Sequence, residues 1–355
     1  MKKKIKIFLL IAGAIAAIIL VVIATVWIVW GKDKLSSFLD SLFRLTGIKQ
    51  EQSVNPNLVT CKLCGKLVDK KDANHYPVAV MIDNHVQARP HIGLNDACII
   101  YETLVEGGIT RLMAVYGHGG VKQVGPVRSA RTYYLDWASE YNALYAHAGG
   151  SPEALQLIRT YGILDMNHYI GQAYWRDLSA KTYFAPHNLF VNIDQLRADG
   201  LKKYSLADKI IQKFHFKNDS GLNNSRAGSI VINYSNYTPC SVKFIYDADT
   251  DTYVRYLGGK IDKDGLSKHS VRVKNLIIQI TPAWLSERRS SRLAMQTTGS
   301  GKALVFQNGR VVSATWRKAT RLDQTRFYNS NNKEIRMNRG LTWISIVRNQ
   351  TLVKY

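Results

Sequence analysis

The longest apolar run of the chain lies at residues 7–30, and it contains no charged residue. At about 1.5 Å per residue, a helix of this length reaches about 36 Å, which is enough to cross a hydrocarbon layer of roughly 30 Å. A cleaved signal peptide has a shorter apolar region followed by small residues, whereas Trp27 and Trp30 close this run. The pattern therefore predicts an uncleaved membrane-spanning helix.

Basic residues flank this predicted helix on both sides. Four lysines precede it and two follow it: Lys2, Lys3, Lys4, Lys6, Lys32 and Lys34. Positive residues favour the cytoplasmic side, and the first flank usually decides the orientation. We therefore expect a single-pass protein in the cell membrane, with residues 1–6 in the cytoplasm and the bulk of the chain outside. The cytoplasmic membrane is its first predicted partner.

After the predicted membrane-spanning helix, residues 31–75 are predicted to form a juxtamembrane connector. Its apolar residues recur at helical spacing, which is typical of a short amphipathic helix at a membrane surface. Beyond it, apolar and β-branched runs predict buried strands. These runs cover residues 76–83, 97–105, 109–116 and 143–148, and the Glu106-Gly107-Gly108 triplet between two of them predicts a tight connection.

Helical segments separate some of these strands. Residues 131–142 have helical character, and Ser151 followed by Pro152 is typical of a helix start. Gly162 predicts the end of that second helix. Strands mixed with helices over residues 76–220 predict an α+β domain.

The sequence pattern changes in the C-terminal part of the chain, where short β-rich stretches alternate with turn residues. Asn308-Gly309, between two apolar runs, is a strong hairpin signal. We therefore predict a smaller β-rich domain over residues 228–355, after a boundary rich in Asn, Ser and Gly. The predicted fold class is α+β.

The chain carries 48 basic and 26 acidic residues, a net charge of +22. Without the six lysines and one aspartate of residues 1–34, 42 basic and 25 acidic residues remain, a net +17. Such a surplus attracts anionic polymers at long range. Outside the cell these are envelope polymers and lipid headgroups, so nucleic acid is not an expected partner.

The cysteine content is low. The Cys61-Lys62-Leu63-Cys64 motif is half of a zinc ribbon, but no second paired motif completes four ligands. For Cys61 and Cys64, a short disulfide or two free thiols is the preferred interpretation. The other two cysteines of the chain are Cys98 and Cys240. No metal ion and no cofactor is assigned from the sequence.

Polar residues gather where the predicted strands of the first domain end. Asp83, Glu102 and Glu106 are candidate catalytic carboxylates for general acid or base chemistry. The candidate ligand-binding residues include four arginines, whose guanidinium groups match phosphate or carboxylate oxygens. The full set is Asn84, His85, Arg89, Arg111, Arg128, Arg131, His147, Gly149, Gly150, Ser151 and His187. Alternatively, the carboxylates only neutralise the arginines.

Two further patterns resemble metal sites, but for both of them a structural interpretation is favoured. His85, His147 and His187 are candidate ligands with Asp83, but none has helical metal-ligand spacing, so satisfied single histidines are favoured. Asp247, Asp249 and Asp251 resemble the start of a calcium loop. Thr252 and Gly258 stand where that loop needs glycine and glutamate, so a hairpin turn is predicted.

Several long strings resemble the YerB-like lipoprotein family, the domain of unknown function 3048, which is found in Gram-positive bacteria. They are PVAVMIDNHVQARP at residues 77–90, YETLVEGGITR at 101–111, GPVRSAR at 125–131, HAGGSPE at 147–153 and APHNL at 185–189, with further similarity at 301–316 and 325–343. The resemblance starts near Val59 and runs to the end of the chain. It implies a layered sheet and helix sandwich, then a β-rich domain, and an extracytoplasmic location. It implies no particular reaction.

The function expected from these observations is binding of an anionic cell-envelope glycan or lipid-linked phosphate through Arg89, Arg111, Arg128 and Arg131. The alternative is an enzyme, an envelope hydrolase or transferase that uses Asp83, Glu102 or Glu106. A third is a non-catalytic partner of cell-wall machinery that binds through the β-rich domain.

Overall fold

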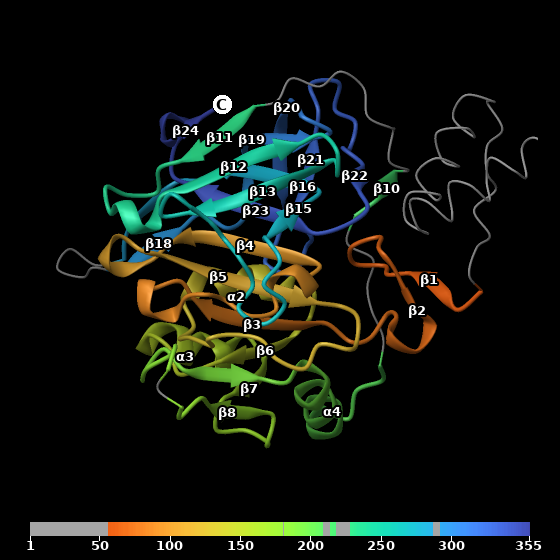
Figure 1. Ribbon diagram of the computed structural model, residues 1–355, viewed down its shortest axis with the longest axis vertical. Helices are drawn as coiled ribbons and strands as arrows, with labels where there is room; N and C mark the ends of the chain where they lie inside the picture. Colours follow the sequence, from red (N-terminus) through yellow and green to blue (C-terminus); the bar gives the residue numbers. More distant parts are fainter. Residues whose placement is uncertain (1–55, 180, 209–213, 218–227, 287–291) are drawn as a thin grey trace, which may run out of the picture. The chain divides into compact units, whose positions relative to one another are not determined.

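The computed structural model describes residues 56–179, 181–208, 214–217, 228–286 and 292–355 (Figure 1). Residues Asn57–Tyr355 form one compact unit. The predicted membrane-spanning helix at 7–30 lies outside the described residues. Within the described part of the chain, no helix has both the length and the apolar character needed to cross a bilayer.

A ten-stranded sheet forms the centre of this unit. In spatial order it contains β21 (Arg326–Tyr328), β20 (Arg310–Lys318), β19 (Gly299–Gln307), β16 (Asn275–Ile280), β23 (Thr342–Val347), β4 (Ile99–Leu104), β5 (Thr110–Tyr116), β3 (Val78–Asp83), β6 (Leu144–His147) and β7 (Leu164–Asn167). The parallel pairing of β23 with β4 joins the two halves of the chain. The predicted domains at 76–220 and 228–355 therefore share one sheet. The predicted α+β class, with more strand than helix, is confirmed.

This sheet is apolar on both faces, which explains the continuous hydrophobic runs in the sequence. Side chains alternate along a strand. In β3, Val78, Val80 and Ile82 enter one hydrophobic cluster, whereas Ala79 and Met81 enter the cluster on the opposite face. Both faces must therefore be covered by other elements.

A second sheet covers part of one face. Its order is β14 (Lys260–Ile261), β13 (Thr252–Leu257), β12 (Val242–Asp247), β11 (Ser229–Ile232) and β24 (Val353–Lys354), and β15 (Arg272–Val273) also pairs with β13. Phe244 of this sheet packs edge-on against Trp343 of the central sheet, with ring centroids 5.9 Å apart. Helix α4 (Ile193–Tyr204) contributes to the same cluster.

The opposite face carries two helices, α2 (Thr132–Ser139) and α3 (Pro152–Thr160). Trp137 of α2 stacks against Tyr101 of β4, with ring centroids 5.5 Å apart. The predicted start of α3 is confirmed, because the Ser151 side chain accepts a hydrogen bond from the Ala154 N–H at 3.2 Å. Gly162 has a φ of +63° just after the helix, as a helix stop requires.

Two predicted turns have the expected backbone. Asn308 and Gly309 both have positive φ, +51° and +66°, between β19 and β20. Both central residues of a type I′ hairpin turn need this conformation. Gly107 and Gly108 also have positive φ in the tight connection between β4 and β5. Local sequence chemistry therefore predicted these turns correctly.

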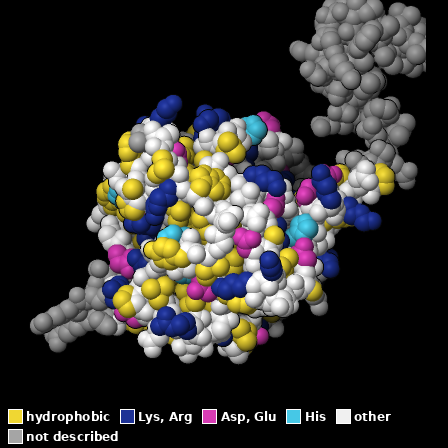
Figure 2. Space-filling view, turned by 90° about the horizontal axis from the view of Figure 1, so that it is seen from below, with side chains coloured by type: hydrophobic (Ala, Val, Ile, Leu, Met, Phe, Trp, Pro, Cys, Tyr) yellow, Lys and Arg dark blue, Asp and Glu magenta, His cyan; other side chains and the backbone are white. Residues whose placement is uncertain are grey.

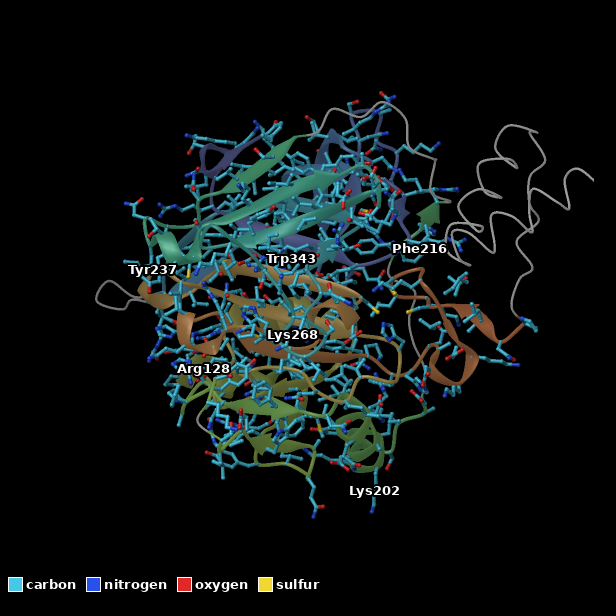
Figure 3. All side chains as sticks on the ribbon, viewed as in Figure 1. Arg128, Lys202, Phe216, Tyr237, Lys268 and Trp343 are labelled. Atoms are coloured by element: carbon cyan, nitrogen blue, oxygen red, sulfur yellow. The ribbon has the colours of Figure 1, made fainter. Side chains whose placement is uncertain are left out.

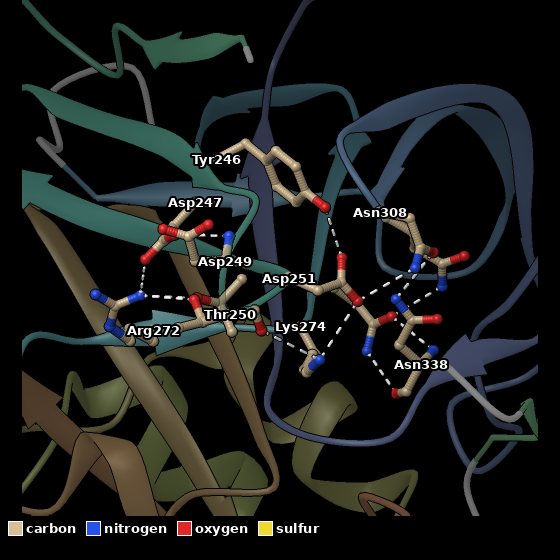
Figure 4. A network of polar contacts seen from close by, with 12 residues as sticks. Tyr246, Asp247, Asp249, Thr250, Asp251, Arg272, Lys274, Asn308 and Asn338 are labelled. Carbon is tan, nitrogen blue, oxygen red and sulfur yellow. Dashed lines mark hydrogen bonds and ion pairs between the residues drawn. The ribbon is translucent and has the colours of Figure 1, made fainter. Parts of the chain in front are cut away.

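The Asp-rich turn between β12 and β13 is a hairpin turn, as predicted (Figure 4). Asp247 pairs with Arg272, and Asp251 pairs with Lys274 at 3.3 Å. Asp249 donates its backbone N–H to the Asp247 carboxylate at 3.1 Å. The two ion pairs use carboxylates that a calcium loop would need.

The compact unit begins earlier than the predicted start at Tyr76. Strands β1 (Leu58–Thr60) and β2 (Leu67–Asp69) form an antiparallel hairpin, and Leu63 in its loop is fully buried. Part of the predicted connector is thus folded. The remaining strands form three small pairs: β8 (Tyr174–Arg176) with β9 (Leu189–Val191), β10 (Phe216–Lys217) with β22 (Met337–Asn338), and β17 (Ala283–Leu285) with β18 (Leu293–Met295).

Candidate functional site

The four polar loops predicted from the sequence meet at one end of the central strands β4, β5, β3 and β6. Residues 125–131 connect them through the backbone. The Asp83 N–H donates to the Pro126 carbonyl at 2.9 Å, the Ala148 N–H to the Arg128 carbonyl at 3.0 Å, and the Arg111 side chain to the Ser129 carbonyl at 2.9 Å. The loops at 83–93, 106–111, 125–131 and 147–153 are therefore neighbours.

Asp83 is the centre of this site. It is the last residue of β3 and is only 1% exposed. Its carboxylate contacts His187 Nδ1 at 2.7 Å and Arg128 Nε at 3.2 Å, and it accepts the His85 N–H at 3.0 Å. Burial raises the pKa of Asp83, but the His85 N–H, His187 and the nearby arginines outweigh it, so the pKa is lowered. The carboxylate is therefore ionised at neutral pH.

Two histidine rings stack beside this carboxylate. The rings of His85 and His187 lie 4.6 Å apart at an interplanar angle of 11°. Burial and the neighbouring His187 lower the pKa of His85, so its ring is neutral at pH 7. Because Nδ1 of His187 faces Asp83, we assign the proton to that nitrogen. Among the described residues, no hydrogen-bond partner contacts Nε2 of either ring.

Arg128 is the site arginine with an accessible guanidinium group. Its side chain is 29% exposed, and Nε contacts Asp83. No residue of the described chain bonds its two terminal nitrogens. In Figure 3, Arg128 lies toward one side of the molecule, whereas Trp343 is fully buried. This guanidinium is therefore available to an external anion.

The other three predicted arginines have partners within the protein. Arg131 forms a bidentate pair with Glu106, with nitrogen to oxygen distances of 2.7 and 2.8 Å. Arg111 is 5% exposed and donates to the Ser129 carbonyl. Arg89 donates to the carbonyls of Asn84 and Pro239 at 2.8 and 2.6 Å. These three arginines hold loops together.

Glu102 also has internal partners. It is fully buried and accepts hydrogen bonds from Arg255 at 2.9 Å, from Thr110 at 2.8 Å and from Trp343 Nε1 at 3.1 Å. Asn84 donates to the Thr110 hydroxyl at 2.6 Å. Of the three candidate catalytic carboxylates, Asp83 is the one that lies beside histidines with accessible nitrogens.

The candidate residues of the 147–153 loop have local roles. His147 is fully buried; its Nε2 contacts Asp165 at 2.9 Å, and its Nδ1 contacts the Gly149 carbonyl at 2.7 Å. Gly150 forms a backbone bridge with Ala130, and Ser151 caps α3. His147 is therefore separate from the His85 and His187 pair.

The structure does not favour a metal ion at Asp83. Within the described residues, Asp83, His85 and His187 do not bring three ligand atoms within 4.8 Å of one another. The site is better suited to acid–base or anion chemistry than to cation coordination.

A groove begins at the residue that follows His85. It has a volume of about 840 Å³ and is lined by Val86, Arg89, Pro90, Thr238, Pro239, Ser241 and residues 257–263. Lys260 and Lys263 on its wall are exposed, whereas Asp262 is buried and paired with Arg255. The groove therefore presents positive charge.

Basic side chains are otherwise dispersed. Figure 2 shows Lys and Arg spread over the face seen from below, between apolar side chains, rather than in one continuous patch. A discrete positive groove beside the Asp83 site is thus a more specific feature than the net charge. Sequence reasoning missed Lys260 and Lys263, because they lie about 180 residues from Asp83 along the chain, and no local motif marks them.

Comparison with known proteins supports a family assignment. The N-terminal domain of a protein of unknown function, DUF3048, matches residues 63–206, and its C-terminal domain matches residues 230–344. The chain is 27% identical over 311 residues to "Putative lipoprotein YerB" of Bacillus subtilis (strain 168), covering 86% of this chain and 92% of that protein. The crystal structure of the YerB protein from Bacillus subtilis aligns with a TM-score of 0.74 at 27% identity, covering 83% of this chain and 99% of that one. The chain therefore belongs to the DUF3048 family, whose activity is unknown.

Proposed function

We propose that this chain is a membrane-anchored protein of the cell envelope that binds an anionic glycan or a lipid-linked phosphate outside the cell. Its similarity to a protein named as a lipoprotein supports the envelope location. The apolar, uncharged run at residues 7–30 supports a spanning helix as the anchor. The net charge of +17 beyond residue 34 supports an anionic partner.

The observation that carries the proposal is the accessible end of Arg128 beside two histidine rings. Asp83 holds the guanidinium through Nε at 3.2 Å, and the terminal nitrogens remain for a ligand. A guanidinium fork matches two oxygens of a phosphate or carboxylate. Lys260 and Lys263 on the adjoining groove wall add charge for a longer anionic chain.

A neutral histidine also suits such a ligand. The lowered pKa of His85 keeps its ring uncharged, so that it can donate one hydrogen bond to a sugar hydroxyl or a phosphate oxygen. The partly exposed His85 ring, stacked on His187, can also pack against a sugar ring. Together these groups bind both the charged and the uncharged parts of a phosphorylated glycan.

Binding can be tested with the full-length protein in detergent and a purified phosphate-containing wall polymer, with an uncharged glycan as the comparison ligand. Arg128→Gln should weaken polymer binding by about 10- to 100-fold, because a hydrogen bond to a charged group contributes about 1.5–3 kcal/mol. Arg310→Gln is the matched control, since Arg310 is exposed and lies in β20, away from the site. Equal affinities of the two variants would reject the proposal.

A hydrolase or transferase that acts on the same kind of ligand is the second candidate, and the Asp83–His187 pair favours it. With Nδ1 on Asp83, the His187 Nε2 can accept a proton from a water molecule or a sugar hydroxyl, as a general base does. Asp83 orients the ring through Nδ1 at 2.7 Å. Arg128 stands nearby to bind the anionic group of the substrate.

Activity separates the two candidates. If the protein is an enzyme, His187→Gln should abolish release of product from the polymer while binding persists through Arg128. Asp83→Asn should lower turnover and also raise KM, because Asp83 holds the Arg128 guanidinium. Absence of any product from the wild-type protein at high enzyme concentration, with binding intact, would reject the enzyme and retain the binding protein.

A further inference from the structure

Three of the four cysteines converge in the folded unit. Cys61 and Cys64 lie in the loop between β1 and β2, and Cys98 lies just before β4. The sulfurs of Cys61 and Cys98 are 3.9 Å apart, and all three sulfurs lie within 4.8 Å of one another. Each residue is at most 1% exposed. The Asp83 site does not use this cluster.

The backbone around Cys61 and Cys64 is arranged as a tight loop. The Gly65 N–H donates to the Cys61 carbonyl at 2.7 Å, and the Cys61 N–H donates to the Lys66 carbonyl at 2.8 Å. Gly65 has a φ of +72°, and a Cβ there would lie 2.8 Å from the Phe216 ring. The loop therefore needs glycine at this position, and it turns both sulfurs toward Cys98.

Backbone N–H groups also point at these sulfurs. The N–H groups of Cys64 and Leu63 point toward the Cys61 sulfur. The Lys66 N–H is a further donor, to Cys64. Donors of this kind stabilise negative charge on sulfur, which is the form in which cysteine binds a metal.

We infer that Cys61, Cys64 and Cys98 form a zinc site. In a tetrahedral Zn²⁺ site with Zn–S bonds of about 2.3 Å, two sulfurs are separated by about 3.8 Å. The observed 3.9 Å between Cys61 and Cys98 matches this separation. Thiolates are soft ligands that favour Zn²⁺ over hard cations such as Mg²⁺ or Ca²⁺.

A disulfide explains the cluster less well than a metal ion. A disulfide joins two sulfurs at about 2 Å and leaves the third as a buried thiol with no bonding role. A metal ion uses all three. Among the described residues, no fourth Cys, His, Asp or Glu joins the group; water or a small external ligand would complete a tetrahedral site there.

The position of the site gives it a structural role. The Gly340 N–H donates to the Cys64 carbonyl at 2.7 Å, and the Thr342 N–H donates to the Cys98 carbonyl at 3.1 Å. A metal ion here would fasten the β1–β2 hairpin to the central sheet, where β4 and β23 pair. This hairpin lies at the start of the unit Asn57–Tyr355. The site would therefore secure the end of the folded unit that follows the predicted anchor.

The test is the metal content of the full-length protein, purified in detergent under reducing conditions with added Zn²⁺ and then desalted. We expect one zinc per chain, and loss of zinc in Cys61→Ser, Cys64→Ser and Cys98→Ser. Cys240→Ser is the matched control, because Cys240 is also buried but contacts Arg89 instead of the cluster. It should retain one zinc per chain.

A second measurement uses the wild-type chain and does not depend on the folding of variants. Under native conditions, zinc should protect three thiols from alkylation, and a strong chelator should expose them. Replacement by Co²⁺ should give the intense thiolate-to-metal absorption of a tetrahedral sulfur site. A zinc-free protein with three free thiols, a protein with a Cys61–Cys64 disulfide, or one that binds Cu⁺ but excludes Zn²⁺ would each overturn the inference.

Discussion

Replacement of Glu102 by alanine should destabilise the protein strongly, because this carboxylate is a structural group. Glu102 and Arg255 are both fully buried and lie 2.9 Å apart. Arg255 also pairs with Asp262 and lies over the Trp343 ring, 4.6 Å from its centroid. Burial lowers the pKa of Arg255, but Glu102 and Asp262 outweigh it and raise the pKa. The guanidinium therefore stays charged and needs both partners.

The loss of stability in Glu102→Ala can be estimated from the groups that lose their partner. Loss of one partner of a buried ion pair costs about 3–5 kcal/mol, because the remaining charge is no longer compensated. The Thr110 hydroxyl and the Trp343 indole N–H also lose their acceptor, so the upper end of that range applies. At roughly 2 °C per kcal/mol, the lower end for domains of 150–250 residues, the melting temperature should therefore fall by about 10 °C.

The assay is thermal unfolding of the full-length protein in detergent, followed by tryptophan fluorescence. Glu106→Ala is the comparison variant, because the Glu106–Arg131 pair is about one-fifth exposed and solvent can compensate for its loss. It should lower the melting temperature less than Glu102→Ala. A Glu102→Ala protein that melts within 2 °C of the wild type would refute the structural role and return Glu102 to the catalytic candidates.

Two further predictions concern stability. Burial lowers the pKa of His91 to about 4, so the unfolded state takes up a proton before the folded state as the pH falls from about 6.5 to about 4. The free energy of unfolding of the wild type should therefore drop by about 2–3 kcal/mol over this pH range. Denaturant titrations of His91→Leu should show a smaller drop. Gly301→Ala should cost about 1–3 kcal/mol by overpacking, because the new Cβ would lie 2.6 Å from Nε1 of the buried Trp316; unchanged unfolding in urea would contradict the packing.

Local chemistry in the sequence predicted many elements and turns of this fold. The run at 76–83 predicted a strand that the structure places at Val78–Asp83. Ser151 and Pro152 predicted the start of α3, and Asn308-Gly309 predicted a hairpin. In each case the residues that determine the conformation are neighbours in the chain. Their backbone preferences act before any tertiary contact forms.

The site was predicted as a set of residues but not as an arrangement. Asp83, His85, Arg128 and His187 were all candidates, yet nothing local indicates that Asp83 contacts a histidine 104 positions away. The same pattern of charged residues also contained Arg131 and Glu106, which neutralise each other. A sequence shows which charges are present, whereas the fold decides which of them pair.

The amino-acid sequence by itself therefore determined many strands and turns and the residue types near the strand ends, whereas the membrane anchor at 7–30 stays a prediction. Only the tertiary structure decided that β4 and β23 pair in one sheet, that Glu102 contacts Arg255, and that Cys98 joins the two cysteines of the hairpin loop. The physical reason is the separation along the chain. Contacts between distant residues depend on how whole apolar faces pack, and no short pattern records that packing.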